Sequence, residues 1–436
     1  GIDKNIPTYS GGLGILAGDT IRAAADLDLP YVAVTLLTRQ GYFKQRIDTK
    51  GIQRASPVAW DIKEHLKPCK PQVRVRLDGR SIKVRAWRYE ACGIHGTTVP
   101  VLYLDTDIAG NHKDDRQLSQ TLYGGDHAYR LRQEWILGTA GIKMLRPLGY
   151  RQIKCFHMNE GHAACLTFEL LAEAMKRDKQ ARLGQRQIKH VRQQCVFTTH
   201  TPVPAGHDAF ALKDARQAIG QHPAWAVAKA LGVKQGVLNM TYLALSLSRY
   251  VIGVAPKHAD VSRAMFPDYS IDAIPNGVPV SSWTAKSIQK LLDQHVPDWR
   301  ADNSQLRYAI KIPLKELWQA HQANKAKLIE RINRHSKVPF RPKALTIGFA
   351  RRATAYKRAD LVLQRLDRLA ALATKHGKFQ IVFAGKAHPQ DTQGQQLIQN
   401  ITDAAQAIGS KVPIAYLPNY NMALAQTLIP GVDLWL

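Results

Sequence analysis

Residues 348–358 read Gly-Phe-Ala-Arg-Arg-Ala-Thr-Ala-Tyr-Lys-Arg and follow the apolar run Leu345–Ile347, which is typical of a buried strand. Four cations occur within eight residues, where a strand is expected to pass into a helix. Such junctions bind anions in α/β proteins, because the N–H groups of a helix start are free there. Arginine adds a fork of donors that matches phosphate, and lysine adds a mobile charge. We therefore predict a phosphate site. The alternative is a solvated basic helix start, and the preceding strand and Tyr356 argue against it.

The pattern around this stretch predicts the fold class. Short apolar runs alternate with helical patterns, which is typical of a parallel, doubly wound α/β sheet. The expected strands are 345–349, 380–383 and 414–417, with a fourth beginning at Val432, and the expected helices are 361–372, 396–407 and 424–428. A complete doubly wound domain has about six strands. We therefore expect the C-terminal unit to be incomplete.

The N-terminal part also reads as α/β. Asp78-Gly79 lies between two alternating runs and predicts a β-hairpin. The other expected elements are a glycine-rich loop at 8–19, helices at 21–27, 126–145 and up to Leu171, a polar helical stretch at 287–334, and strands at 31–37, 99–104, 153–156 and 194–199. Pro275-Asn276-Gly277 marks a boundary. We predict an N-terminal domain at 1–275 and a partial C-terminal domain at 276–436.

Composition limits the class of protein. The 436 residues are 45% hydrophobic and 22% charged, which is ordinary for a globular protein of two or three domains. No window approaches the ~18 apolar residues of a membrane span. The start lacks an apolar signal-peptide core and an initiator methionine, so we do not expect a natural beginning at Gly1. The five scattered cysteines form no Cys-x-x-Cys pair, which favours reduced thiols in a cytoplasm.

The formal net charge is +27, which predicts attraction to polyanions. A dedicated nucleic-acid protein usually concentrates its charge in one patch. Here lysine and arginine are spread along the chain, so we expect no specific nucleic-acid partner and no membrane partner.

Three further groups of residues could carry chemistry. The run Gly11-Gly12-Leu13-Gly14 could bring backbone donors close to an anion or a sugar, although a plain structural turn explains it as well. The histidines of His157-Met158-Asn159-Glu160-Gly161-His162 are five apart, which disfavours a metal site on one helix face. Polar residues at a strand end favour ligand binding, and a packed strand–helix corner is the alternative. His200, Trp283 and Tyr420, taken alone, are typical of core residues.

These segments, in the same order along nearly the whole chain, resemble the α-glucan phosphorylases (glycogen, starch and maltodextrin phosphorylases), most closely the shorter bacterial and archaeal branch. The resemblance implies two Rossmann-like domains facing a cleft (the GT-B type), the second of them incomplete. It implies a pyridoxal 5′-phosphate-dependent glycosyltransferase that cleaves α-1,4-glucan or maltodextrin with inorganic phosphate. The product is glucose 1-phosphate, with retention.

The resemblance also implies residue roles. Arg352 and Lys357 match residues that hold substrate phosphate, and His200 matches a donor to the glucosyl unit. The matched substrate-binding residues are Gly11, Gly12, Leu13, Gly14, Asn159, Glu160, His162 and Asn276. The matched cofactor-binding residues are Arg351, Trp283 and Tyr420. No metal is implied, a homo-oligomer is compatible with the family, and we expect no regulatory site.

The chain departs from the family pattern in several places. Residues 253–263 and Pro279 differ from the usual residues. The family lysine that forms the Schiff base follows the match to Ile429–Asp433, and the family also has a segment before the match to Gly1. We therefore expect a fragment truncated at both ends that is inactive alone. A nucleotide-sugar glucosyltransferase of the same fold and a non-catalytic glucan-binding remnant are the alternatives.

Overall fold

A computed structural model describes residues 1–122, 124–203 and 206–436. The described chain is a mixed α/β structure with parallel sheets. Three four-stranded sheets have the orders β1-β6-β5-β4, β13-β12-β8-β7 and β16-β15-β14-β17. The last two are parallel throughout, and the first combines a parallel β1–β6 pair with antiparallel neighbours. The predicted α/β class is therefore confirmed.

The strands are β1 (Ala33–Leu36), β2 (Lys44–Ile47), β3 (Gln53–Ser56), β4 (Lys67–Leu77), β5 (Arg80–Cys92), β6 (Thr98–Asp105), β7 (Phe156–Asn159), β8 (Cys195–Thr199), β9 (Ala209–Ala211), β10 (Val233–Lys234), β11 (Val237–Asn239), β12 (Tyr250–Gly253), β13 (Asp272–Ala273), β14 (Leu345–Ala350), β15 (Phe379–Ala384), β16 (Ile414–Leu417) and β17 (Leu434–Trp435).

The α-helices are α1 (Gly11–Asp26), α2 (Ile62–His65), α3 (Lys113–Gln117), α4 (His127–Trp135), α5 (Gly141–Leu145), α6 (Leu166–Arg177), α7 (Gln185–Gln194), α8 (Leu212–Ile219), α9 (Trp225–Gly232), α10 (Met240–Ser246), α11 (Pro256–Met265), α12 (Val280–Trp283), α13 (Lys286–His295), α14 (Leu314–Asn333), α15 (Leu366–His376), α16 (Thr392–Ile408) and α17 (Met422–Gly431). A π-helical turn, η1 (Ile136–Ala140), joins α4 to α5. Short 3₁₀ turns are η2 (Gly161–Ala163), η4 (Asn303–Lys311), η5 (Ala355–Lys357), η6 (Leu361–Leu363) and η7 (Gly409–Lys411).

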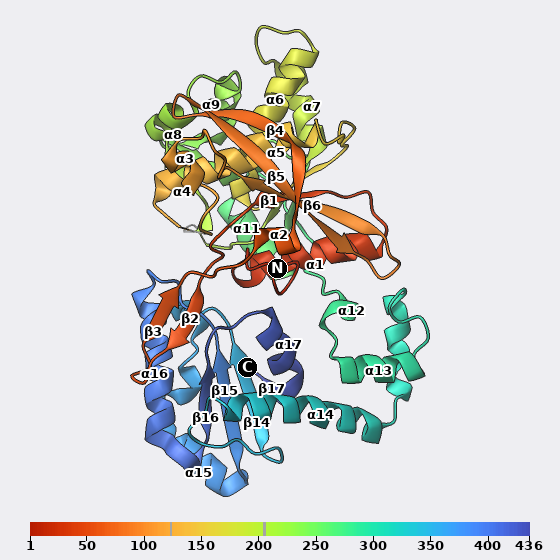
Figure 1. The fold of residues 1–436 in the computed structure, drawn as a ribbon, viewed down its shortest axis with the longest axis vertical. Coiled ribbons are helices and arrows are strands. Elements are labelled where there is room, and N and C mark those ends of the chain that lie inside the picture. The colour runs from red at the N-terminus through yellow and green to blue at the C-terminus, as the bar shows by residue number, and fades with distance from the viewer. Residues whose placement is uncertain (123, 204–205) are drawn as a thin grey trace.

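The C-terminal sheet is buried on both faces because its strand residues alternate between two clusters. Val382 and Ala384 of β15 join the core under α14 and α17, whereas Ile381 and Phe383 join the core under α15 and α16. This period of two explains why the strand reads as a continuous apolar run in the sequence. Figure 1 shows these helices around the sheet in the lower half of the molecule.

The N-terminal residues link the two halves. Figure 1 places α1 between the upper sheets and the C-terminal sheet, and the β2–β3 hairpin extends downward to lie beside α16. The hairpin is bonded to loops at the carboxyl ends of the C-terminal strands. The Gln53 amide donates to the Ala387 carbonyl over 3.0 Å and accepts from Ala387 N over 3.1 Å, and Asn419 N donates to Gln45 Oε1 over 2.8 Å.

Several predicted elements are confirmed. The hairpin turn at Asp78-Gly79 joins β4 to β5, and the expected 126–145 helix begins at its N-cap Asp126 and continues through η1 into α5. The alternation of strands and helices after residue 345 is present, with β17 as the fourth strand.

Other predictions were wrong in position. Residues 11–19, expected in a loop, lie in α1, because packing of α1 against β5 and β6 outweighs the poor helix propensity of glycine. The strand expected at 153–156 lies at Phe156–Asn159. The cation stretch does not enter an α-helix directly. The single turn η5 follows β14, and α15 begins only at Leu366.

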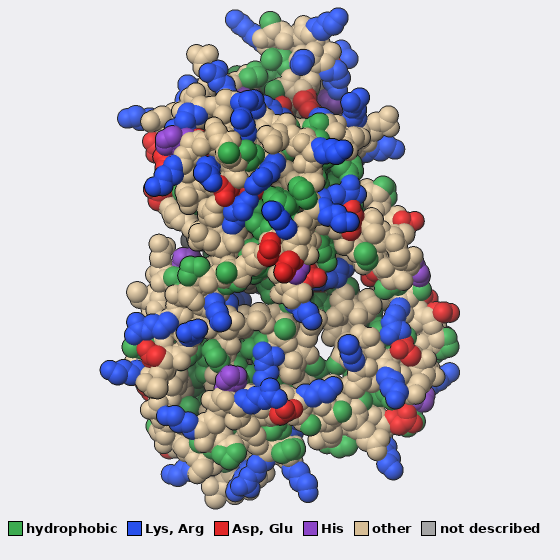
Figure 2. Space-filling view, viewed as in Figure 1, with side chains coloured by type: hydrophobic (Ala, Val, Ile, Leu, Met, Phe, Trp, Pro, Cys, Tyr) green, Lys and Arg blue, Asp and Glu red, His purple; other side chains and the backbone are tan. Residues whose placement is uncertain are grey.

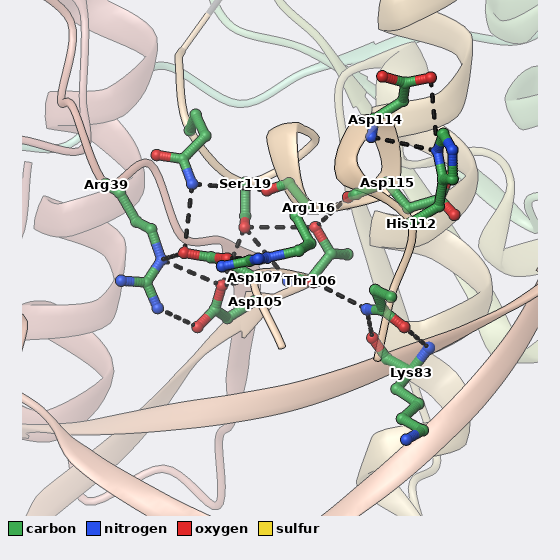
Figure 3. A network of polar contacts seen from close by, with 12 residues as sticks. Arg39, Lys83, Asp105, Thr106, Asp107, His112, Asp114, Asp115, Arg116 and Ser119 are labelled. Carbon is green, nitrogen blue, oxygen red and sulfur yellow. Dashed lines mark hydrogen bonds and ion pairs between the residues drawn. The ribbon is translucent and has the colours of Figure 1, made fainter. Parts of the chain in front are cut away.

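A buried carboxylate fixes the loops at the end of β6 (Figure 3). Asp105 has no exposed surface and accepts hydrogen bonds from Arg39 Nη2 (2.6 Å), Arg85 Nε (2.9 Å), Trp87 Nε1 (2.9 Å) and Ser119 Oγ (2.9 Å). Burial alone would raise the pKa of Asp105, but the hydrogen bonds from Arg39 and Trp87 outweigh it and lower the pKa.

Figure 2 shows lysine and arginine side chains scattered over the whole displayed face rather than gathered in one patch, as the sequence predicted. Within the described residues, no helix combines the length and apolar character that crossing a bilayer requires.

Candidate active site

A cavity of about 2510 Å³ is lined by residues at the carboxyl ends of strands from two parallel sheets. Parallel sheets bind ligands outside these ends, where adjacent loops diverge. Asn159 ends β7, His200 follows β8, Asn276 follows β13, and Arg352 follows β14. Of the predicted site residues, the cavity wall includes Leu13, Gly14, Asn159, Glu160, His162, His200, Asn276 and Arg352.

Arg352 lies over the N-terminus of α1. A Cβ atom added to Gly11 would come within 3.2 Å of Arg352 Nη2, so the guanidinium lies close against the glycine backbone. Gly11 has φ of +63°, a left-handed conformation that favours glycine. The N-cap Ser10 makes no side-chain cap, which leaves the first N–H groups of α1 without that partner. A cation and a helix N-terminus thus face the same space, which is an arrangement that suits an anion.

The side chain of Glu160 joins the ends of β7 and β8 through hydrogen bonds. Its side chain is 5% exposed and accepts from His200 N (2.8 Å), Gly161 N (3.0 Å) and Thr201 Oγ1 (3.4 Å). Its φ of +75° is unusual for a residue other than glycine. Burial raises the pKa of Glu160 although these donors oppose the rise. The residue therefore positions backbone at the site, and its strained conformation fits a functional position.

His200 is held by its ring and its backbone. Its Nε2 is hydrogen-bonded to Asn159 Oδ1. Burial, with the nearby His162, His258 and His157, lowers the pKa of His200 to about 4. Burial likewise lowers the pKa of His162 to about 4. Both rings are therefore neutral near pH 7, and with Oδ1 as the acceptor the His200 proton is on Nε2.

These shifts predict a pH dependence of stability. A histidine whose folded pKa is about 4 and whose ordinary pKa is 6.5 binds protons more readily when unfolded. Its contribution to the free energy of unfolding is therefore complete above pH 6.5 and is lost as the pH falls toward 4. We expect His200→Gln to flatten the fall in urea midpoint between pH 6.5 and 4, relative to the unsubstituted chain. The exposed His95→Gln is the control. Equal slopes for His200→Gln and the parent chain would contradict this assignment.

Six predicted residues do not lie on the wall of this cavity, namely Gly11, Gly12, Trp283, Arg351, Lys357 and Tyr420. Lys357 Nζ lies 4.8 Å from the ring centroid of Tyr356, which is 73% exposed. Trp283 Nε1 donates to Asp19 Oδ1 of α1 over 2.8 Å. Tyr420 packs against the core beneath α14 and α17, beside Tyr9, which accepts from Met422 N over 3.0 Å.

Sequence reasoning missed a group of polar residues on the wall, among them Arg130, Glu134, Asp208, His388 and Gln390. Arg130 and Glu134 could have been found, because they lie four apart in a helix whose next residues, Trp-Ile-Leu-Gly, are apolar. No local signal predicted His388, because its place depends on how the loop after β15 meets the N-terminal residues. Among the described residues, no group of three potential metal-ligating side chains could hold a metal ion.

The parallel sheets, with a cation after β14 and a helix N-terminus beside it, are typical of an α/β protein whose ligands bind outside the carboxyl ends of the strands. The sequence model of the carbohydrate phosphorylases matches residues 208–435, and the chain belongs to this family. It is 35% identical to the maltodextrin phosphorylase of Thermococcus litoralis over all of this chain and 56% of that protein.

Two further relatives support the assignment. The glycogen phosphorylase of Mycobacterium tuberculosis is 32% identical, and the match covers all of this chain and 56% of the relative. The glycogen phosphorylase of Aquifex aeolicus is 31% identical, and the match covers all of this chain and 68% of the relative. The chain thus spans little more than half the length of the first two relatives.

Proposed function

We propose that this chain carries the sugar- and phosphate-binding surfaces of an α-1,4-glucan phosphorylase. The reaction transfers the terminal glucosyl unit of a glucan or maltodextrin to inorganic phosphate, with retention, and yields glucose 1-phosphate. The observation that carries the proposal is the placement of Arg352 over Gly11 at the N-terminus of α1, on a cavity that also contains His200 and Asn276. The names of the relatives support the substrate class.

The proposed architecture is two Rossmann-like domains of the GT-B type, residues 1–275 and 276–436, the second incomplete. Two wholly parallel sheets whose carboxyl ends contribute to one cavity support it. The β2–β3 hairpin belongs to the first segment in sequence but is bonded to the second through Gln45 and Gln53.

In the proposed reaction, the protein positions a charged nucleophile beside a sugar. Arg352 forms paired hydrogen bonds to phosphate, and Lys357 reaches it by turning its flexible stem away from Tyr356. The helix start at Gly11–Gly14 adds backbone donors. His200 and Asn276 orient the glucosyl unit, and Asn159, Glu160 and His162 form the glucan side. Fixed donors of this kind lower the barrier by orientation and by stabilising developing charge.

Pyridoxal 5′-phosphate is the proposed cofactor, held by Arg351, Trp283 and Tyr420. Arg351 and Tyr420 follow β14 and β16, which flank β15, so both belong to the edge of the sheet where anionic groups bind. Burial raises the pKa of Tyr420 to about 12, so its hydroxyl keeps its proton and can donate at neutral pH. When bound, the cofactor's 5′-phosphate supplies a group that exchanges a proton with the substrate phosphate.

The test is phosphorolysis by the complete gene product. We expect release of glucose 1-phosphate from maltodextrin and inorganic phosphate, and we expect the rate to fall at least about 100-fold in Arg352→Ala because a charge-assisted pair is lost. Release of a nucleoside diphosphate from a nucleotide sugar and glucan, without phosphorolysis, would instead show a glucosyltransferase. Glucan binding with neither reaction would show a binding remnant.

A further inference from the structure

The cavity wall contains a buried group of charges that the proposed sugar and phosphate contacts do not use. Arg130 and Glu134 lie four residues apart on α4, so they share one helix face. Asp208 reaches them from the segment before β9, and all three line the cavity with His162. The Glu134 side chain is only 4% exposed.

Arg130 contacts Asp208 more closely than it contacts Glu134. Arg130 Nη2 lies 2.8 Å from Asp208 Oδ2, whereas its Nε lies 3.4 Å from Glu134 Oε1. Within the described part of the chain, neither Glu134 oxygen has a hydrogen-bond donor in bonding geometry. A buried carboxylate without donors is costly, and two carboxylates beside one guanidinium resist ionising together.

The other titratable groups that face the cluster bring no compensating positive charge. His162, from η2, is neutral because burial lowers its pKa to about 4. Cys165, just before α6, has a pKa raised well above its ordinary value, chiefly by burial, so its thiol is uncharged. Among these facing groups, Arg130 is the cation, and its short contact is with Asp208.

We propose that Glu134 is an uncharged carboxylic acid at neutral pH that donates its proton in a hydrogen bond to Asp208. The Arg130–Glu134–Asp208 cluster is then electrically neutral. The shared proton links α4 to Asp208, whose backbone oxygen accepts from Met240 N of α10 over 2.9 Å. Glu134 is thus a positioning residue that keeps Arg130 and Asp208 on the cavity wall. The inference does not depend on the proposed function.

The raised pKa of Glu134 supports this arrangement. Burial is the main cause, Asp208 adds to the rise through its charge and a hydrogen bond, and the neighbouring Arg130 opposes the rise without cancelling it. A carboxyl group whose folded pKa exceeds its ordinary value of 4.5 binds its proton more tightly in the folded state. The folded protein therefore loses stability as the pH rises from 4.5 through the folded pKa.

Glu134→Gln tests the sign of this effect. Glutamine has the shape of the protonated acid and cannot ionise. The stability of the variant therefore does not fall as the pH rises past 4.5 on account of residue 134. We expect its Tm, relative to the parent chain, to rise by a few degrees between pH 4.5 and pH 8. Glu330→Gln is the control, because Glu330 and Arg334 are also an ion pair four residues apart, in the reverse order and on the exposed surface. A Glu134→Gln variant that becomes less stable than the parent as the pH rises would show an ionised Glu134 paired with Arg130 and would overturn the proposal.

Infrared spectroscopy tests the proton directly and does not require a folded Glu134 variant. At pH 7 the parent chain should show the carbonyl stretch of a protonated, buried carboxyl group. Asp208→Asn should lose the band, because Glu134 then ionises beside Arg130. Absence of the band from the parent chain at pH 7, or its persistence in Asp208→Asn, would overturn the assignment.

Discussion

Replacement of Arg352 by alanine is expected to weaken the binding of inorganic phosphate by about 100-fold. The guanidinium lies against Gly11 at the N-terminus of α1, and Arg352 lines the cavity with Leu13 and Gly14 of the same helix start. A hydrogen bond to a charged group contributes about 1.5–3 kcal/mol, and losing a paired contact of about 3 kcal/mol corresponds to roughly two decades in Kd. Isothermal titration calorimetry with inorganic phosphate would measure the change.

The +27 charge of the chain makes the control essential, because phosphate could bind weakly to many surface cations. Arg365→Ala removes an exposed arginine that pairs with Asp367 and should leave the affinity unchanged. Arg352→Lys should retain part of the affinity, since lysine keeps the charge but not the planar fork. Equal weakening by Arg352→Ala and Arg365→Ala would mean that binding is nonspecific and that Arg352 is not the phosphate ligand.

Replacement of Asp105 by alanine is expected to destabilise the chain by about 3–5 kcal/mol, the usual cost of breaking a buried charge pair by removing one partner. Asp105 has no surface exposed to water and accepts from Arg39 (Figure 3) and from Arg85 and Trp87. Its removal takes one acceptor from each of two guanidinium groups, which keep their contacts with Asp107, and leaves the indole N–H of Trp87 without its acceptor. Urea unfolding followed by tryptophan fluorescence would give the free energy of unfolding.

The loss of stability in Asp105→Ala should extend to the residues beside the cavity wall. Arg39 N donates to the Ser119 carbonyl over 3.1 Å and Gln40 N donates to the Gln120 carbonyl over 2.8 Å, just before Leu122 on the cavity wall. Hydrogen exchange at residues 38–41 and 119–122 should therefore accelerate in Asp105→Ala. Asp367→Ala, which removes an exposed partner of Arg365, should change neither quantity appreciably. Unchanged unfolding in Asp105→Ala would show that the network carries little stability.

The sequence by itself determined the α/β class, the β4–β5 hairpin and the strand–helix alternation after residue 345. These features follow from local rules: the period of side chains along a strand or helix, and the turn that Asp78-Gly79 favours. Single residues at strand ends were also visible, among them Asn159, His200 and Arg352. Their roles came from resemblance to a family, because no local rule assigns a role to a lone side chain.

Only the tertiary structure decided which of these residues meet. Arg352 reaches the cavity because the loop after β14 folds against Gly11, more than 300 residues earlier in the chain. The glycine run became the first turn of α1 because packing against β5 and β6 outweighed local preference. Glu134 beside Asp208, and the β2–β3 hairpin beside α16, likewise depend on contacts between distant segments. Such contacts follow from the burial of whole elements, and the period of a short stretch carries no information about them.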